Sequence, residues 1–342
     1  MVHLAALKGS CRTEVHHAAQ DSLYTEIFVE LPEKRGVVNK LSHQFRYYWA
    51  LFNIVKQLVK SGNKPDCIHA QVTWKCGFDA ALLSKWFGIP FLVTEHNTDW
   101  LPEDRKYPLW KRLLSRWALK KANAVTAVSQ NLANAIEKET KKKVEVIPNS
   151  IHPAFLPEKV GSAPQIPVFL HISNFRNAHK QTDRIVKVFS LFAEENAEAM
   201  LQLNVPEKEF RSFKEQNPHY AWDRIELLPP AADRQTLAER MSKATAIVSY
   251  SRFETFGLTL AEAACLGVPS IYTACGGADV FFDAEMGEMC DADNDQSLLK
   301  AMHYAALPGR FNRQLIAEKG RRLFSNDAVL EAYDKLYRNI TN

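Results

Sequence analysis

The stretch SRFETFGLTLAEAACLGVPSIYTACGG, residues 251–277, contains in succession the signals of a turn, a helix and a strand. Its apolar residues recur at helical spacing and predict a helix over about 258–266. The Gly-Val-Pro sequence that follows predicts the end of this helix, and the apolar run 270–273 predicts a strand closed by Gly276 and Gly277. We therefore expect a strand-turn-helix-strand unit of an α/β fold.

The start of the predicted helix has the properties of an anion site. Gly257 precedes it and carries no side chain that would hinder a ligand, so the backbone amides that begin with Leu258 and Thr259 can donate hydrogen bonds to a phosphate. Glu254 precedes the helix and Glu262 lies eight residues later, about two helical turns away. A carboxylate there can accept two hydrogen bonds from a vicinal diol such as a ribose. Taken alone, the two acids fit solvated surface carboxylates better.

The sequence ETFGLTLAEAACLGVPS, residues 254–270, with the Gly-Gly turn behind it, resembles the donor-binding E-x7-E signature of family 4 glycosyltransferases, which are retaining, nucleotide-sugar-dependent enzymes with the GT-B fold. The resemblance implies that Glu254 faces the sugar and that Glu262 binds the ribose. It places the base near Leu228 and Pro229, and Asp279 is the nearest match to an acid that often follows the Gly pair. The other implied donor contacts are Phe256, Gly257, Leu258, Thr259, Gly276 and Gly277.

A chain of 342 residues is longer than a single hydrophobic core usually supports, so we expect two domains. The resemblance implies an α/β, GT-B architecture of two Rossmann-like domains, whose mostly parallel sheets face each other across a cleft. We expect an acceptor-binding domain over 1–157, a nucleotide-sugar-binding domain over 164–325, and a C-terminal helix over 326–342 that crosses back to the first domain.

The N-terminus departs from the family pattern. MVHLAALKG, residues 1–9, predicts the last turns of a helix, and CRTEVHHAA, residues 11–19, predicts the strand after it. In the resembled family a strand and a Gly-rich loop precede that helix, and the loop lies close to the donor phosphates and the acceptor. We therefore expect a first domain that lacks part of its sheet, and doubtful activity of the chain in this form.

Two further segments carry implied site residues. FLVTEH predicts a strand that delivers His96 to its C-terminal end, where open α/β sheets bind ligands, and T-E-H-N-T matches a family His that contacts the sugar. The segment after Val168 predicts a strand, a loop and a helix, and Arg176 and Lys180 of that loop are expected to hold the diphosphate. The family usually has Gly where Gln181 stands. The S-N-F-R sequence of this loop is similar to enzymes that glycosylate L-malate, and the acceptor is left open.

Composition limits the remaining possibilities. No apolar run approaches the roughly 20 residues that cross a bilayer, and residues 1–10 lack the successive regions of a signal peptide, so a cytoplasmic protein is expected. Six cysteines without a C-x-x-C pair indicate reduced thiols. The acidic run 291–295 lacks the Gly and Glu of a calcium loop and predicts a helix N-cap instead. No metal and no other cofactor are expected.

Charge is uneven along the chain. Residues 1–160 contain 23 Lys and Arg against 15 Asp and Glu, whereas the rest contains 20 against 24. A basic first half suggests an anionic partner, such as a lipid-linked phosphate or the inner face of a membrane, where the protein would be peripheral. A basic helical segment fits a membrane surface and a solvated face about equally well; it contains Lys111, Arg112, Arg116, Lys120 and Lys121, interleaved with Trp110 and Trp117. A nucleic-acid partner is less favoured, since no recognition motif is present.

The expected activity is transfer of a sugar from a nucleoside-diphosphate sugar to a hydroxyl acceptor, with retention. Cell-surface polysaccharide, lipopolysaccharide or a lipid-linked precursor are the acceptors we expect. The residues with catalytic roles are His96, Glu254, Arg176 and Lys180. The helix amides and the two cations would stabilise the leaving diphosphate in place of a metal. Two alternatives stay open: a GT-B-fold sugar-nucleotide epimerase, and a non-catalytic protein that binds nucleotide sugars.

Overall fold

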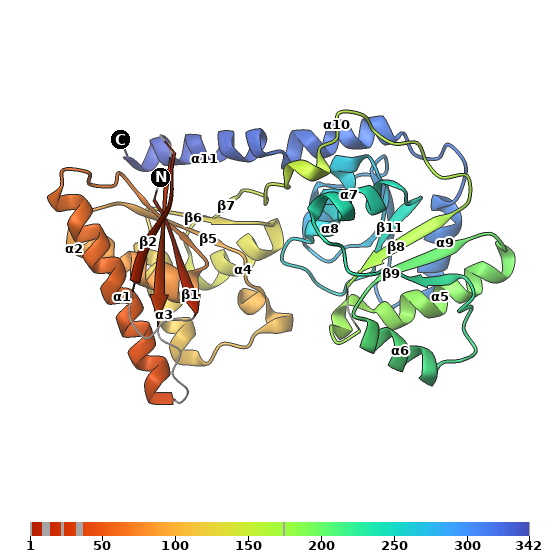
Figure 1. The fold of residues 1–342 in the computed structure, drawn as a ribbon, viewed down its shortest axis with the longest axis horizontal. Coiled ribbons are helices and arrows are strands. Elements are labelled where there is room, and N and C mark those ends of the chain that lie inside the picture. The colour runs from red at the N-terminus through yellow and green to blue at the C-terminus, as the bar shows by residue number, and fades with distance from the viewer. Residues whose placement is uncertain (1, 9–13, 22–23, 32–36, 174, 342) are drawn as a thin grey trace.

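The computed structural model describes the backbone of residues 2–8, 14–21, 24–31, 37–173 and 175–341, and side chains from residue 45 onward within those ranges. The chain forms two α/β domains side by side (Figure 1). Within the described residues, no helix is both long and apolar enough to cross a membrane. The cysteines among those residues are all free thiols.

The second domain contains a six-stranded sheet in the order β10-β9-β8-β11-β12-β13, in which every neighbouring pair is parallel. The strands in chain order are β8 (Val168–Ile172), β9 (Met200–Asn204), β10 (Ile225–Leu227), β11 (Ala246–Ser249), β12 (Ser270–Thr273) and β13 (Gly287–Cys290). The helices are α5 (Thr182–Glu195), α6 (Glu207–Gln216), α7 (Arg234–Ser242), α8 (Leu258–Leu266), α9 (Asp295–Ala305) and α10 (Arg313–Phe324). The chain winds outward from β8 on one side and from β11 on the other. The loops after these two strands therefore leave the sheet at its topological switch point, where α/β folds bind ligands.

This sheet is buried between helices on both faces, as its apolar strands require. One core cluster includes Phe169 and Phe189, and the other includes Ile247 and Leu260, all of which are inaccessible to solvent. The predicted helix after the turn corresponds to α8, and the predicted strand after it to β12. Asn294 caps α9 by accepting a hydrogen bond from the Ser297 amide at 3.1 Å, as the acidic run before that helix predicted.

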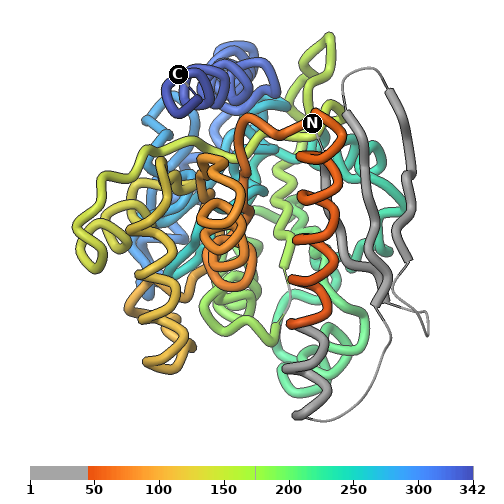
Figure 2. The backbone as a smooth tube through the Cα atoms, turned by 90° about the vertical axis from the view of Figure 1, so that its left-hand side faces the viewer, coloured from red at the N-terminus to blue at the C-terminus, as the bar shows by residue number. Residues whose placement is uncertain are grey.

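The first domain contains a parallel sheet in the order β4-β5-β6-β7 and a separate sheet in the order β1-β3-β2. The strands of the parallel sheet are β4 (Ile68–Gln71), β5 (Phe91–Glu95), β6 (Ala124–Ala127) and β7 (Glu145–Val146). The strands of the separate sheet are β1 (Val2–Lys8), β2 (Glu14–Asp21) and β3 (Tyr24–Leu31). The helices are α1 (Val37–Lys60), α2 (Phe78–Phe87), α3 (Leu109–Lys121) and α4 (Gln130–Thr140). Leu51 and Val55 of α1 pack with Leu83 of α2, and α1 runs along one side of the domain in Figure 2.

The N-terminal helix prediction was wrong. Residues 2–8 form β1, which pairs in parallel with β3 over its whole length. A short apolar run fits a helix or a strand by periodicity alone, and pairing with another strand decides between them. The strand predicted over 11–19 coincides with β2 in the part that the structure describes, and residues 11–13 lie outside the described residues.

The C-terminal helix α11 (Asn326–Thr341) crosses back to the first domain, as predicted, and lies at the upper edge of Figures 1 and 2. Val329 and Leu336 pack with Ile147 in a small apolar cluster. A polar contact accompanies this packing: the Tyr333 hydroxyl lies 2.9 Å from Oγ1 of Thr94 in β5. The last helix therefore completes one face of the first-domain sheet.

Candidate active site

Two loops converge at the switch point of the second domain. The loop after β8 ends in the 3₁₀ turn η5 (Ala178–Lys180), and the loop after β11 carries Glu254. The Lys180 ammonium donates a hydrogen bond to Oε1 of Glu254, and Ser251 Oγ lies 3.0 Å from the same oxygen. The Glu254 amide donates to the Cys275 carbonyl at 3.2 Å, which places this carboxylate beside the end of β12 as well.

The backbone at Gln181 fixes the direction of the Lys180 loop. Gln181 has φ +50°, in the left-handed region that favours glycine. Its side chain is buried and donates from Nε2 to the Tyr250 carbonyl at 3.3 Å, which ties this loop to the loop that follows β11. The family usually has glycine at this position, which fits the positive φ of the backbone. In this chain Gln181 adopts the same conformation, and its side chain also makes the hydrogen bond to Tyr250.

The start of α8 lies next to Glu254. Gly257 has φ +82°, and a Cβ built on it would lie 3.8 Å from Glu254 Cγ, so the carboxylate side chain lies against the helix start. The first-turn amides of a helix have no partner within the helix and can donate to a ligand. Leu258, the first residue of α8, is 45% exposed, which shows that this helix end is open to solvent.

The Gly276–Gly277 turn fits closely behind the Glu254 loop. A Cβ on Gly277 would lie 2.5 Å from the Phe256 carbonyl oxygen and 2.9 Å from Glu254 Cβ, so only glycine permits this approach. Oδ1 of Asp279 accepts from the Gly277 amide at 2.6 Å and thereby holds the turn in place. A Cβ on Gly276 would lie 2.5 Å from Asn131 Nδ2 of α4, so the turn also touches the first domain.

Other predicted donor residues have different surroundings. Glu262 is buried on α8 with its Oε1 3.7 Å from Arg234, and burial raises the pKa of its carboxyl to about 7 against the opposing effect of that guanidinium. Phe256 packs on Phe324 in the core, with ring centroids 5.9 Å apart, so only its backbone is available to a ligand. The Leu228 side chain is likewise buried in the core.

Arg176 does not join this group. Its Nε lies 2.7 Å from Oε1 of Glu209 on α6, and its side chain is 79% exposed. The other oxygen of Glu209 accepts from the Phe175 amide at 2.9 Å, so this part of the loop is tied to α6. Arg176 and Lys180 belong to one loop but point to different surroundings, and only Lys180 meets Glu254.

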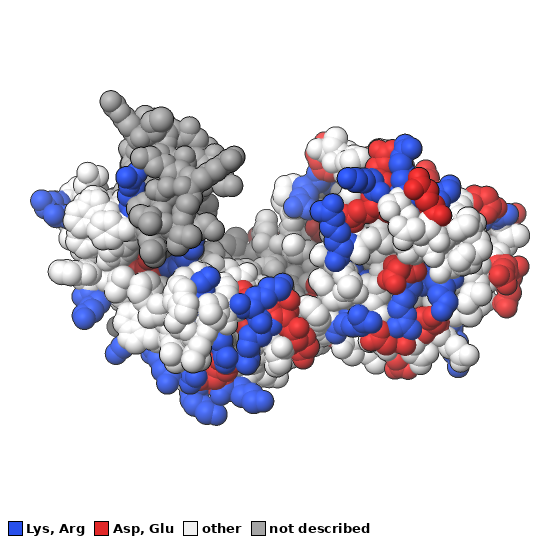
Figure 3. Space-filling model, turned by 90° about the horizontal axis from the view of Figure 1, so that it is seen from below, with Lys and Arg blue, Asp and Glu red and all other residues white. Residues whose placement is uncertain are grey.

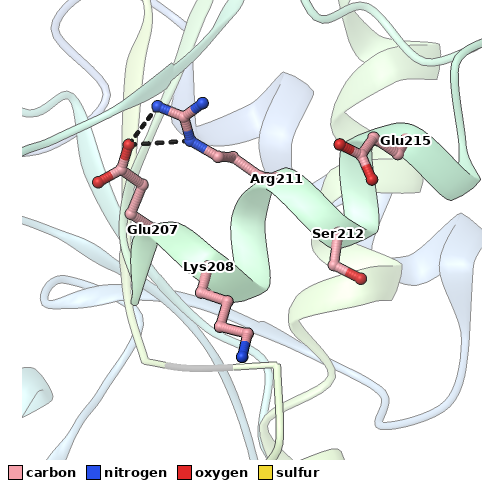
Figure 4. Close-up of a pocket in the computed structure, with 5 residues that line it drawn as sticks. All are labelled: Glu207, Lys208, Arg211, Ser212 and Glu215. Carbon is pink, nitrogen blue, oxygen red and sulfur yellow. Dashed lines mark hydrogen bonds and ion pairs between the residues drawn. The ribbon is translucent and has the colours of Figure 1, made fainter.

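A cavity of about 510 Å³ lies over the outer face of α6 (Figure 4). Its lining consists of Glu207, Lys208, Arg211, Ser212 and Glu215. All of them belong to a single helix, and Glu207 and Arg211 pair with each other. A substrate site usually gathers polar groups from several elements in a concave pocket, so this surface is not the site. The hollow between the two lobes in Figure 3 is the better position.

In the first domain, His96 follows β5 at the end of the strand, as predicted. The preceding residue, Glu95, is 1% exposed and accepts four hydrogen bonds. The donors are the amides of His96 and Asn97 to Oε1, each at 2.9 Å, and the Thr73 amide and the Trp100 indole to Oε2 at 2.9 and 3.0 Å. This carboxylate fixes the turn that presents His96. An acid at the end of a mostly apolar strand is a weak signal for this role in the sequence.

The His96 ring is also fixed. Its Nε2 lies 2.8 Å from Oε1 of Gln71 at the end of the neighbouring strand β4. Burial lowers the pKa of His96, and the Glu95 carboxylate opposes this effect. The imidazole is therefore neutral at physiological pH and can exchange hydrogen bonds with a sugar.

Charged groups of both domains act on His179, which lies near the site. His179 precedes Lys180 and stacks on Phe253, with ring centroids 4.6 Å apart. Burial and Lys180 lower the pKa of His179, whereas the carboxylates of Glu254 and Asp104 oppose this effect. Asp104 belongs to the first domain, so its charge reaches the Lys180 loop across the interdomain space. Among the described residues, no three His, Cys, Asp or Glu side chains gather closely enough to hold a metal ion.

The chain belongs to family 4 of the glycosyltransferases. A model described as Glycosyltransferase Family 4 matches residues 2–155, and one described as Family 4 Glycosyltransferase in conflict systems matches residues 110–303. The chain is similar to N-acetyl-alpha-D-glucosaminyl L-malate synthase of Bacillus anthracis, with 26% identity over 297 residues that cover 80% of this chain and 75% of the relative.

Solved structures show the same fold. A UDP-forming α,α-trehalose-phosphate synthase of Burkholderia xenovorans superimposes with a TM-score of 0.75 at 12% identity and covers 100% of both chains. Anabaena HepE in complex with UDP superimposes with a TM-score of 0.73 at 13% identity, covering 91% of this chain and 86% of its own. The predicted family and the predicted GT-B architecture are therefore confirmed.

Proposed function

We propose that this protein transfers a sugar from a nucleoside-diphosphate sugar to a hydroxyl acceptor, with retention of the anomeric configuration. Family membership supports the transferase class. The convergence of Lys180, Glu254 and the open start of α8 at one switch point supports the donor site, and it is the observation that carries the proposal.

In the proposed reaction, the diphosphate binds the first amides of α8 and the Lys180 ammonium. The bond between sugar C1 and the diphosphate oxygen breaks, and these donors stabilise the charge that develops on the leaving group, so the scheme needs no metal. The acceptor oxygen forms the new bond to C1, and its proton passes to the leaving diphosphate or to water. Glu254 then accepts hydrogen bonds from the sugar, because Lys180 has turned to the phosphates, and Glu262 accepts from the ribose.

Two features of the chain support our assignment of the remaining groups. His96 reaches the sugar from the first domain, because it stands at the ligand-binding end of β5. Arg176 has no part in this scheme, since its guanidinium pairs with Glu209. Among the structurally similar proteins, one is a UDP-forming synthase and another was solved in complex with UDP, which supports a UDP-sugar ahead of a GDP-sugar as the donor.

The acceptor is proposed to be a glycan or a lipid-linked precursor that the protein meets at the cytoplasmic face of a membrane. Helix α3 supports this part, because its residues Leu109, Trp110 and Leu113 are each more than half exposed. Lys120 and Lys121 at its end are exposed as well. An amphipathic helix with exposed aromatic and basic residues suits an anionic lipid surface. The basic residues on this lobe are seen in Figure 3.

The experiment is a screen of the purified chain against UDP- and GDP-sugars by thermal shift, followed by assays of sugar transfer. A donor that binds the folded form raises its melting temperature. We expect one donor to do so, and a glycan or a lipid-linked phosphate, rather than L-malate, to be glycosylated only when that donor is present. Conversion of the donor to an epimer without acceptor contradicts the proposal. So does a donor that binds but is neither hydrolysed nor transferred, or a Glu254→Ala variant that transfers at the wild-type rate.

A further inference from the structure

A chain of hydrogen bonds connects the C-terminal helix to His96. The Tyr337 hydroxyl of α11 lies 2.6 Å from Nδ1 of His69 in β4. Nε2 of His69 lies 3.1 Å from Nε2 of Gln71, and Oε1 of Gln71 lies 2.8 Å from Nε2 of His96. These four side chains come from positions up to 268 residues apart in sequence.

The amide of Gln71 gives this chain a direction. Its NH₂ group can only donate, so Nε2 of His69 accepts and the proton of that ring is on Nδ1, which donates to Tyr337. Nε2 of His69 also lies 2.7 Å from the Thr94 hydroxyl, which can donate to it. Burial lowers the pKa of His69 to about 4, so this ring is neutral, as the arrangement requires.

The carbonyl oxygen of the Gln71 amide determines which ring nitrogen of His96 carries the proton. Oε1 of Gln71 can only accept, so Nε2 of His96 carries a proton and donates it. A neutral His96 then has a bare Nδ1, which has no hydrogen-bond partner among the residues that the structure describes. A ring nitrogen of this kind can accept a hydrogen bond but cannot donate one.

We propose that Gln71 is a positioning residue for His96, held in place by His69 and Tyr337, and that it makes Nδ1 of His96 an acceptor for a substrate hydroxyl. Its effect on transfer rests on the proposed function, whereas the proton position on the ring does not. The last helix of the chain thereby acts on the site through two side chains without lying in it.

The test is nitrogen-15 NMR of the histidine rings of the full chain at about pH 8, where a neutral imidazole shows separate shifts for its bare and protonated nitrogens. The His96 signals are assigned from their loss in His96→Ala. We expect Nε2 to carry the proton in the wild type. Gln71→Ala should produce a mixture of the two tautomers, and Gln71→Glu should restore the Nε2 proton, because a carboxylate also accepts.

The matched control is Gln202→Ala, which removes another strand glutamine whose amide meets a carboxylate of the neighbouring strand at 2.9 Å in the second domain. It should leave the His96 signals unchanged. Gln71 is exposed, so its removal should not unfold the chain. A wild-type His96 with a bare Nε2, or a Gln71→Ala variant with unchanged ring shifts, overturns the proposal.

Kinetics then test the consequence for transfer. In Gln71→Ala we expect kcat to fall about tenfold, which is about the effect of losing one neutral hydrogen bond in the transition state, and Gln71→Glu to recover part of it. The affinity for the free nucleoside diphosphate should not change, because its proposed contacts lie in the second domain. Unchanged kcat with altered tautomers shows that the ring position does not matter for transfer and overturns that part.

Discussion

Each domain has a carboxylate at the ligand-binding end of its parallel sheet, and the two carboxylates have different partners. Glu95 in the first domain accepts from three backbone amides and one indole, all of them neutral and fixed by the fold. Glu254 in the second domain accepts from the ammonium of Lys180, which stands on a flexible stem, and from a serine hydroxyl.

The different donors indicate a structural role for Glu95 and a ligand-binding role for Glu254. Backbone amides cannot turn away from Glu95, so its role is to hold the turn that presents His96. An ammonium can leave Glu254 for a phosphate and free the carboxylate for a sugar. Under the proposed function, we therefore expect the first-domain site to keep its arrangement when a ligand binds and the Lys180–Glu254 pair of the second domain to separate.

The largest effect is expected from a substitution in the Lys180–Glu254 pair. Lys180→Ala should lower the rate of sugar transfer about 10²- to 10³-fold, because one charged group that stabilises the leaving diphosphate is lost. Arg176→Ala, from the same loop, should lower it less than about fivefold, because that side chain is exposed and paired with Glu209. Steady-state transfer kinetics measure both. Equal losses of transfer rate in the two variants would contradict the different roles assigned to Lys180 and Arg176.

The Glu95 carboxylate should contribute to the free energy of unfolding. Glu95→Gln replaces one acceptor oxygen by an NH₂ group that faces fixed N–H donors, and we expect a loss of about 2–3 kcal/mol in unfolding free energy. Glu145→Gln, an exposed residue of β7, is the control and should change it by less than about 0.5 kcal/mol. Urea unfolding followed by tryptophan fluorescence measures both. A Glu95→Gln variant as stable as its control would show that the four hydrogen bonds contribute nothing.

The smallest effect concerns Glu262, whose folded pKa of about 7 lies above its ordinary value of 4.5. The folded protein binds this proton more tightly than the unfolded chain, so stability is lost as the pH rises from about 4.5 through 7. Glu262→Gln keeps a neutral group, and its stability relative to the wild type should rise by about 1–2 kcal/mol across that interval. Melting temperatures at pH 5 and pH 8 measure it, with Glu239→Gln, at an exposed position of α7, as the control. A difference independent of pH contradicts the burial of this carboxyl.

Local signals allowed much of the second domain to be predicted. The helix α8, the strand after it and the glycine turn follow from periodicity and stop signals within one short stretch. The same reasoning placed His96 at the end of a strand. It failed over residues 2–8, where pairing with β3 decided between strand and helix.

Contacts between distant segments were beyond this reasoning. The donors to Glu95 come from several turns, and the chain from Tyr337 to His96 links the last helix to two strands. Arg176 and Lys180 are equivalent as charges in the sequence, and only the arrangement of α6 and the β11 loop separates them. Hydrophobic spacing carries no information on such side-chain directions.

The crossing of α11 also bears on how this protein is made. Its 16 residues cover Ile147 and supply the hydroxyls that meet Thr94 and His69. A ribosome releases the whole second domain before these residues emerge, so the first domain to be synthesised is the last to be completed. A fragment that ends before residue 164 would lack α11 and expose the apolar surface around Ile147 to water.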